Sequence, residues 1–230
     1  MLKKTTLKNL YSEIRKYLCY MIPEKWESIY LYASVIENNN NTTNGEMFFY
    51  YFPKSVIKKN PVNVYEIPRK FNINEEEYMK LVDKLYELIK DLRKECIKFD
   101  KEAWSNVTIS IENVEFLVEY NYDELKNSVY TSDDRRIVWK YKYLDYPIEK
   151  LNKQEKEMLQ AFLEEEEMGQ HQLKVYSETF YQKHEHNNIE YDREKVEYIQ
   201  EDNEVNSREN DNNENNNRDK VIKSQLLKLN

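Results

Sequence analysis

The side chains that most often carry catalysis are scarce in this chain. Its three histidines, His171, His184 and His186, all lie in the C-terminal third. A Ser-His or Cys-His nucleophile needs a histidine as its base, and no histidine precedes residue 171 to supply one. His184 and His186 flank Glu185 and could ligate a metal ion, but no third ligand is fixed beside them, so we favour a solvated pair. We therefore expect no catalytic, cofactor-binding or metal-binding residue.

Glycine narrows the function classes further. Gly45 and Gly169 are the two glycines of the sequence. A phosphate-binding loop, a dinucleotide fingerprint and a nucleophile elbow each need glycines at fixed spacing, and none can be built here. Asp133 and Asp134 are adjacent acids at a candidate helix start, where carboxylates more often act as caps than as an acid–base pair. The sequence predicts a protein that is not an enzyme.

The net charge of −8 belongs to one end of the chain. Residues 1–150 hold 24 basic and 24 acidic residues, whereas residues 151–230 hold 11 and 19. Within the balanced part, Glu102 to Leu125 carries six acids and no lysine or arginine. This segment is either a solvated sheet face or a surface that attracts a basic partner. The candidate partner-binding residues are Glu112, Glu115, Glu119, Asp123 and Glu124.

Two alternatives from other classes stay open. A short basic cluster could make the chain a nucleic-acid-associated regulator; its members are Arg135, Arg136, Lys140 and Lys142. Because no long basic stripe is present to meet phosphates, we do not expect direct nucleic-acid binding. The acidic tail could instead recruit another protein, which would make the chain an adaptor.

A long helix should organise the elements that hold these residues. Apolar residues recur every three or four positions from Ile73 to Phe99, and Asn74 and Glu77 form a capping box at its start. An earlier helix, capped by Thr5 or Thr6, should end before Pro23.

Strand patterns occupy the rest of the first 122 residues. Alternation over residues 26–36 and 47–52, around a polar loop at 37–45, predicts one hairpin, and residues 104–111 and 116–120 predict another. Residues 62–67 read as a short strand. The order helix, hairpin, helix, hairpin predicts an α+β fold, with an antiparallel sheet of two hairpins packed against two main helices.

The last third is organised differently. Residues 132–144 carry both a capped-helix pattern, which we favour, and a strand-like alternation. Apolar residues between 148 and 163 could line a charged helix, and residues 206–218 are of low complexity. We expect a domain over residues 1–150 and an acidic, Asn-rich extension over 151–230 that runs from partly helical to largely disordered. Cys19 and Cys96 are expected to be buried thiols, and the absence of an apolar span favours a cytoplasmic protein.

Several strings in family order carry a resemblance. They are MIPEKWESIY at 21–30, GEMFFYY at 45–51, IPRKF at 67–71, the pairs Leu85-Tyr86 and Leu92-Arg93, and WKYKYL at 139–144. Over about residues 10–148 the chain resembles the YezG family of bacterial immunity proteins (antitoxins). The motif positions are Pro23, Trp26, Tyr30, Gly45, Phe49, Pro68, Trp139 and Tyr141. The loop at 38–44 is longer than the family pattern, and the chain past 150 has no counterpart in it.

The resemblance implies a partner and a role. A member of this family would bind and neutralise a cognate nuclease toxin of the LXG or type VII secretion kind, in the cytoplasm, without a cofactor and without being an enzyme. It would protect the producing cells. The resemblance supplies no active-site residues, and it leaves the oligomeric state and the toxin's identity open.

Overall fold

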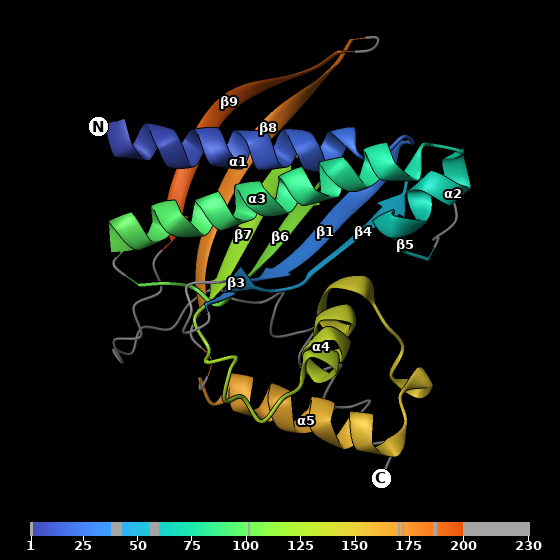
Figure 1. Cartoon of the computed structure of the whole chain (residues 1–230), viewed down its shortest axis with the longest axis vertical. Coiled ribbons are helices and arrows are strands. Elements are labelled where there is room, and N and C mark those ends of the chain that lie inside the picture. The colour runs from blue at the N-terminus through green and yellow to red at the C-terminus, as the bar shows by residue number, and fades with distance from the viewer. Residues whose placement is uncertain are drawn as a thin grey trace, which may run out of the picture.

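Helices lie on both faces of one antiparallel sheet. The computed structural model describes residues 2–37, 43–55, 60–100, 102–169, 171, 173–185 and 188–199. One face carries α1 (Leu2–Tyr20) and α3 (Glu75–Asp100), and the other carries α4 (Ser132–Leu144), against which α5 (Lys153–Glu167) packs (Figure 1). The sheet is therefore the middle layer, and the predicted α+β class is confirmed.

The sheet is antiparallel throughout, in the order β5-β4-β1-β6-β7-β8-β9. Its strands are β5 (Val62–Asn63), β4 (Met47–Pro53), β1 (Trp26–Ser34), β6 (Asn106–Glu112), β7 (Glu115–Asn121), β8 (Leu173–Glu185) and β9 (Asn188–Ile199). Both predicted hairpins form, and pairing of β1 with β6 joins them edge to edge. A separate pair, β2 (Ile36–Glu37) with β3 (Thr43–Asn44), extends the first hairpin.

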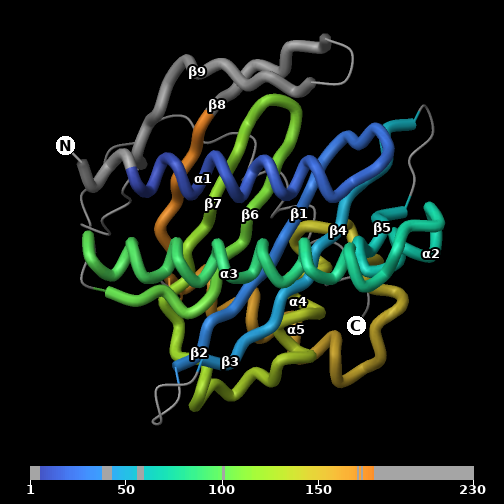
Figure 2. The backbone as a smooth tube through the Cα atoms, turned by 45° about the horizontal axis from the view of Figure 1, so that its top comes forward, coloured from blue at the N-terminus to red at the C-terminus, as the bar shows by residue number. Residues whose placement is uncertain are grey.

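The main core lies between the sheet and the α1/α3 layer. Alternate residues of the central strands, such as Leu31 and Ile109, are fully buried there. From α3, Leu85 and Ile89 meet them, as the period of the long helix predicts. Asn74 accepts a 3.0 Å hydrogen bond from the Glu77 amide, which confirms the predicted start of this helix. Figure 2 shows α1 and α3 running side by side across the strands.

Two local expectations are corrected. The first helix begins at Leu2, before the expected caps Thr5 and Thr6, because the leucine and lysines there favour helix. Residues 62–67 are not one strand: after Val62 and Asn63 the chain turns into η1 (Val64–Glu66) and α2 (Ile67–Phe71). The Asn63 side chain accepts the Tyr65 amide at 3.1 Å, and proline fits the first turn of α2.

Residues 132–144 form a helix rather than a strand. Thr131 and Asp134 make a reciprocal capping box, with hydrogen bonds of 3.2 Å and 2.8 Å. The adjacent acids Asp133 and Asp134 therefore make different contacts. Asp134 caps the helix, and Asp133 lies 4.0 Å from Arg136.

Beyond residue 150 the sheet continues. The helix expected from the apolar residues of 148–163 forms as η2 (Ile148–Lys150) and α5. β8 and β9 were not expected, because this segment was predicted to be largely disordered; β8 pairs with β7 along the full length of β7, and β9 pairs with β8. The division of the chain at residue 150 stays a prediction, and residues 206–218 lie outside the described part.

Candidate functional site

The face of the sheet turned towards α4 changes character from one strand to the next. One cross-strand row runs Phe48 on β4, Tyr32 on β1, Thr108 on β6 and Glu119 on β7. Phe48 and Tyr32 stack at 4.8 Å between ring centroids. The row is thus aromatic at one end and carries a carboxylate at the other.

α4 covers this row with two aromatic side chains. The indole nitrogen of Trp139 donates to Thr108 Oγ1 at 3.1 Å, and the Tyr143 hydroxyl donates to Glu119 Oε2 at 2.8 Å. Trp139 is almost fully buried against the aromatic half of the row. These two hydrogen bonds, one from Trp139 and one from Tyr143, therefore fix the position of α4 on the sheet.

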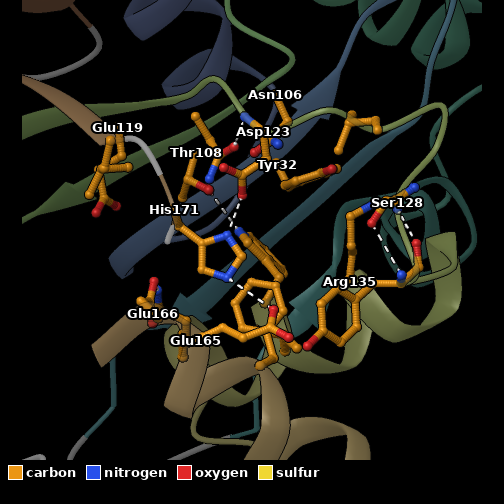
Figure 3. A pocket seen from close by; sticks show the side chains of 18 of the residues that line it. Tyr32, Asn106, Thr108, Glu119, Asp123, Ser128, Arg135, Glu165, Glu166 and His171 are labelled. Atoms are coloured by element: carbon orange, nitrogen blue, oxygen red, sulfur yellow. Dashed lines mark hydrogen bonds and ion pairs between the residues drawn. The ribbon is translucent and has the colours of Figure 1, made fainter. Parts of the chain in front are cut away.

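A cavity of about 470 Å³ opens beside the polar half of the row. Its walls come from β1, β6 and β7, the segment 122–130, α4, α5 and the residues that follow α5 (Figure 3). The polar and charged side chains in its lining include Tyr32, Glu119, Asp123, Glu124, Arg135, Lys142, Glu165, Glu166 and His171.

The lining is predominantly acidic. It contains five carboxylates but one arginine and one lysine. Lys142 forms a 2.6 Å ion pair with Glu166, and Arg135 Nη1 donates to the Tyr130 carbonyl at 2.5 Å. Both basic groups are thus already engaged by the wall.

His171 joins α5 to the end of the second hairpin. Its Nδ1 lies 2.5 Å from Asp123 Oδ2, and its Nε2 lies 3.8 Å from Glu165 Oε2. The ring stacks on Phe162 at 4.5 Å. Figure 3 shows the imidazole between the two carboxylates, with Arg135 on the far side of the cavity.

Burial shifts the titration of several groups in the wall. Desolvation raises the pKa of Glu119, against a lowering by the Tyr143 hydrogen bond, and burial raises the pKa of Tyr143 well above its usual range. Burial also raises the pKa of Tyr32 to about 12, although the nearby Arg135 charge lowers it. The pKa of Tyr130 is raised to about 12, first by burial and then by its hydrogen bond with Glu165.

Three polar atoms in this wall are buried with no hydrogen-bond partner among the described residues. They are the Tyr32 hydroxyl, Arg135 Nε and His171 Nε2. Buried polar groups are normally satisfied, so each such atom is a place where a bound water or a ligand atom would complete the hydrogen bonding.

The predicted partner-binding residues fall into two groups. Glu119, Asp123 and Glu124 line the cavity. Glu112 ends β6 and Glu115 begins β7, so both lie exposed beside the turn that joins these strands, where Glu112 accepts a 2.9 Å hydrogen bond from Tyr30. The structure does not bring all five together.

Sequence reasoning missed the part of the cavity wall that α5 and the residues after it supply. Glu165, Glu166 and His171 were assigned to a charged helix end and a tail. One signal was available: glutamates at 164–167 end a helix whose dipole disfavours negative charge there, which suggests another use for them.

The motif positions have mostly structural surroundings. Phe49 and Pro68 are buried, Trp139 covers the aromatic row, and Tyr141 packs between α4 and α5. Gly45 lies against the Ser34 carbonyl, where a Cβ atom would come within 1.9 Å. Pro23 is exposed, and Trp26 and Tyr30 are partly buried.

Other expectations concern cysteines, metals and membranes. Cys19 and Cys96 are both buried thiols, as expected. The described residues hold no group of three or more histidine, cysteine or acidic side chains placed for a metal ion; the side chains of His184 and His186 lie outside them. No described helix combines the length and apolar character needed to cross a membrane.

Comparison with known proteins assigns the fold to a class. Residues 7–160 match a family model described as "Immunity protein YezG-like". The protein is thus an immunity protein, a class that acts by binding a toxin and not by catalysis. Because the match covers more than half of the chain, the chain belongs to the YezG-like family, as its motifs predicted.

Individual relatives support the same family assignment. The chain is 31% identical over 138 residues to "Immunity protein YezG" of Bacillus spizizenii, an alignment that covers 59% of this chain and 81% of the relative. It is 29% identical over 141 residues to the protein of the same name in Bacillus subtilis, covering 60% and 87%. It is 28% identical over 138 residues to "Type VII secretion system protein EsaG" of Staphylococcus aureus, covering 59% and 80%.

Proposed function

We propose that this protein binds and neutralises a cognate nuclease toxin exported by a type VII secretion system, and that it does so in the cytoplasm of the producing cell. The observation that carries the proposal is the immunity-family match over residues 7–160. The similarity to EsaG, which is named as a type VII secretion system protein, supports the secretion route. The motif resemblance to immunity proteins of LXG toxins supports a nuclease as the target.

The surface charge suits such a target. A nuclease must offer basic groups to phosphates, and carboxylates on an inhibitor can occupy them. Glu112 and Glu115 are exposed at the hairpin turn, and Glu124 is exposed beside the cavity. Complementary charge of this kind speeds encounter and weakens as salt rises.

The geometry does not favour the alternative of nucleic-acid binding. Of the four basic residues proposed for it, Lys142 is paired with Glu166 and Arg135 donates to a backbone carbonyl. Arg136 lies over the Phe48 ring at 5.0 Å, and Lys140 lies 5.9 Å from the Tyr50 ring. These side chains attach to their own domain and do not form a stripe that phosphates could follow.

Co-expression tests the proposal. The chain is produced with a catalytically inactivated toxin domain taken from a gene beside its own, and the complex is purified through a tag on the toxin. We expect the two proteins to co-purify, and the purified chain to inhibit the active nuclease stoichiometrically. Failure to inhibit any toxin encoded beside the gene would contradict the proposal.

A charge-reversal variant tests the acidic turn. Replacing Glu112 and Glu115 by lysine should slow association about tenfold at low salt, with a smaller difference at high salt. The matched control is Asp83→Lys with Asp91→Lys, the same charge change at exposed positions of α3 on the opposite layer. Equal slowing by both pairs would mean that net charge alone acts and that the turn is not part of the interface.

A further inference from the structure

We propose that the cavity between β7, α4 and α5 receives an arginine side chain of the toxin, together with the peptide backbone that carries it. This assignment rests on the proposed function and adds the site and the chemistry of the recognised group. Its supports are the excess of carboxylates in the wall, the unpartnered Tyr32 and Arg135 atoms, and the arrangement around His171.

The basic residues of the wall do not neutralise all of its carboxylates, so the cavity can accept a positive charge. Lys142 neutralises Glu166, whereas no lysine or arginine among the described residues lies within ion-pair distance of Glu119, Glu124 or Glu165. Glu119 is bonded to a neutral tyrosine hydroxyl, and burial raises its pKa. A cation in the cavity would stabilise the charged form of these carboxylates.

The side of the cavity formed by Tyr32 and Arg135 favours a hydrogen-bond acceptor rather than a cation. The Tyr32 side chain is 4% exposed, and neither its hydroxyl nor Arg135 Nε has a partner in good hydrogen-bond geometry among the described residues, although Arg135 and Ser34 lie close enough to the hydroxyl to lower the pKa of Tyr32. Two donors in one wall are satisfied by an acceptor such as a peptide carbonyl. A bare metal ion could not supply that acceptor, so the pair favours a peptide segment over a simple cation.

His171 marks the place of the basic group. When its Nδ1 proton is donated to Asp123, the neutral ring presents an Nε2 acceptor towards Glu165, 3.8 Å away. These two acceptors are too close for a nitrogen to lie on the line between them, but an N–H donor set to one side of the pair can reach both. A guanidinium carries five such donors in a planar fork and can also stack on the aromatic wall at Phe162 or Tyr130.

The size and the origin of the wall agree with this role. A volume of about 470 Å³ falls within the range of pockets that bind small ligands, roughly 300–1,000 Å³. Glu165 and His171 lie beyond residue 160, where the family match ends. The framework of the cavity is therefore the family's, whereas part of its acidic lining comes from the segment outside the match, which suits recognition of one particular toxin.

Short peptides test the chemistry of the cavity without the toxin. The full chain is titrated with acetyl-Gly-Arg-Gly-amide, with the same peptide carrying uncharged citrulline, and with a glutamate version. The indole N–H resonance of Trp139, whose donor contacts Thr108 in the wall, reports binding. We expect a saturable shift with the arginine peptide and at least about tenfold weaker binding of the citrulline peptide.

Variants locate the binding. Asp123→Asn with Glu165→Gln should weaken both the arginine peptide and the toxin by at least about tenfold. The matched control Glu164→Gln, an exposed neighbour on the same helix, should change neither. If the double variant shows altered thermal unfolding, Glu165→Gln alone replaces it.

The outcomes separate the two proposals. Equal shifts with all three peptides, or an unchanged response in the variants, would overturn the cavity assignment. Tight binding of the toxin by both the parent and the double variant would overturn it too while leaving the proposed function intact. Failure of the parent to bind the toxin would overturn the proposed function, and with it the assignment of the arginine to the toxin.

Discussion

The Tyr143 hydroxyl donates a 2.8 Å hydrogen bond to the Glu119 carboxylate and so ties the last turn of α4 to the middle of β7. Glu119 was selected from the sequence as part of an exposed acidic face. Its position under α4 makes it a wall of the cavity and gives it a titration that can be measured.

Stability should depend on pH through Glu119. Burial raises its pKa above the ordinary 4.5, so the folded protein keeps this proton at a pH where the unfolded chain has lost it. The free energy of unfolding therefore gains from this group below about pH 4.5 and loses that gain as pH rises through the raised pKa. Urea unfolding of the parent and of Glu119→Gln across this range measures it; parallel pH curves would contradict the prediction.

Tyr143→Phe should act on the same group. The hydrogen bond from Tyr143 lowers the pKa of Glu119, so its loss should raise that pKa further. With the carboxylate charged, the loss should cost about 1.5–3 kcal/mol of stability. Carboxyl-carbon NMR titration of Glu119 follows the first effect and urea unfolding the second. Tyr146→Phe, a substitution in the loop after α4, serves as the control, and an unmoved Glu119 titration would show that the contact is not maintained in solution.

Glu178→Gln should destabilise the domain by about 3–5 kcal/mol. Glu178 and Arg15 are 6% and 3% exposed, and their side chains lie 3.7 Å apart across β8 and α1. Removing the Glu178 charge takes a buried ion pair away from the Arg15 guanidinium, whereas replacing both residues by methionine should restore much of the loss. Thermal or urea unfolding of the single and double variants checks this. A single variant as stable as the parent would show that β8 does not hold this position in solution.

Gly45→Ala should cost at least about 2 kcal/mol. A Cβ atom there would lie 1.9 Å from the Ser34 carbonyl oxygen and 2.1 Å from the Tyr86 hydroxyl, which itself donates to that carbonyl. Gly169→Ala is the matched control, since nothing lies within 4 Å of the added atom and only its positive φ is strained. Unfolding measurements in which Gly169→Ala is the more damaging change would refute the steric explanation.

Leu85→Asp and the reversal of Glu112 and Glu115 should both reduce protection, for different reasons. Leu85 is fully buried under the sheet, so an unpaired carboxylate there should unfold the domain. The exposed glutamates should change association with the fold intact. Circular dichroism of each variant distinguishes the two cases, and loss of helical signal in the charge-reversed protein would place those glutamates in the scaffold instead.

The sequence predicts most of the scaffold because its buried positions are apolar and periodic. Leu31 and Ile109 follow the strand period and Leu85 and Ile89 the helix period, and each is buried where the period places it. The same reasoning fails for β8. Its buried positions include Glu178, whose carboxylate is paired with Arg15 of α1 and accepts a hydrogen bond from Tyr176, and no local pattern reveals a partner as far away in the chain as Arg15.

For the cavity, too, the sequence predicts the elements but not the contacts between distant segments. Glu115 and Glu119 share a face of β7, yet one is exposed and the other lies under Tyr143, because α4 covers only part of that face. His171 meets Asp123 across 48 positions of sequence. Patterns within one element cannot supply such contacts, which depend on where a helix from a later segment packs.

The pairing of β8 with β7 sets an order of events during synthesis. The edge of β7 is complete at Asn121, whereas the strand that covers it begins at Leu173. At the usual rates of translation, roughly 5–20 residues per second, that edge spends seconds without its neighbour. An uncovered edge strand can pair with another chain. Nascent copies that share one messenger RNA are therefore exposed to pairing with each other until their own β8 emerges.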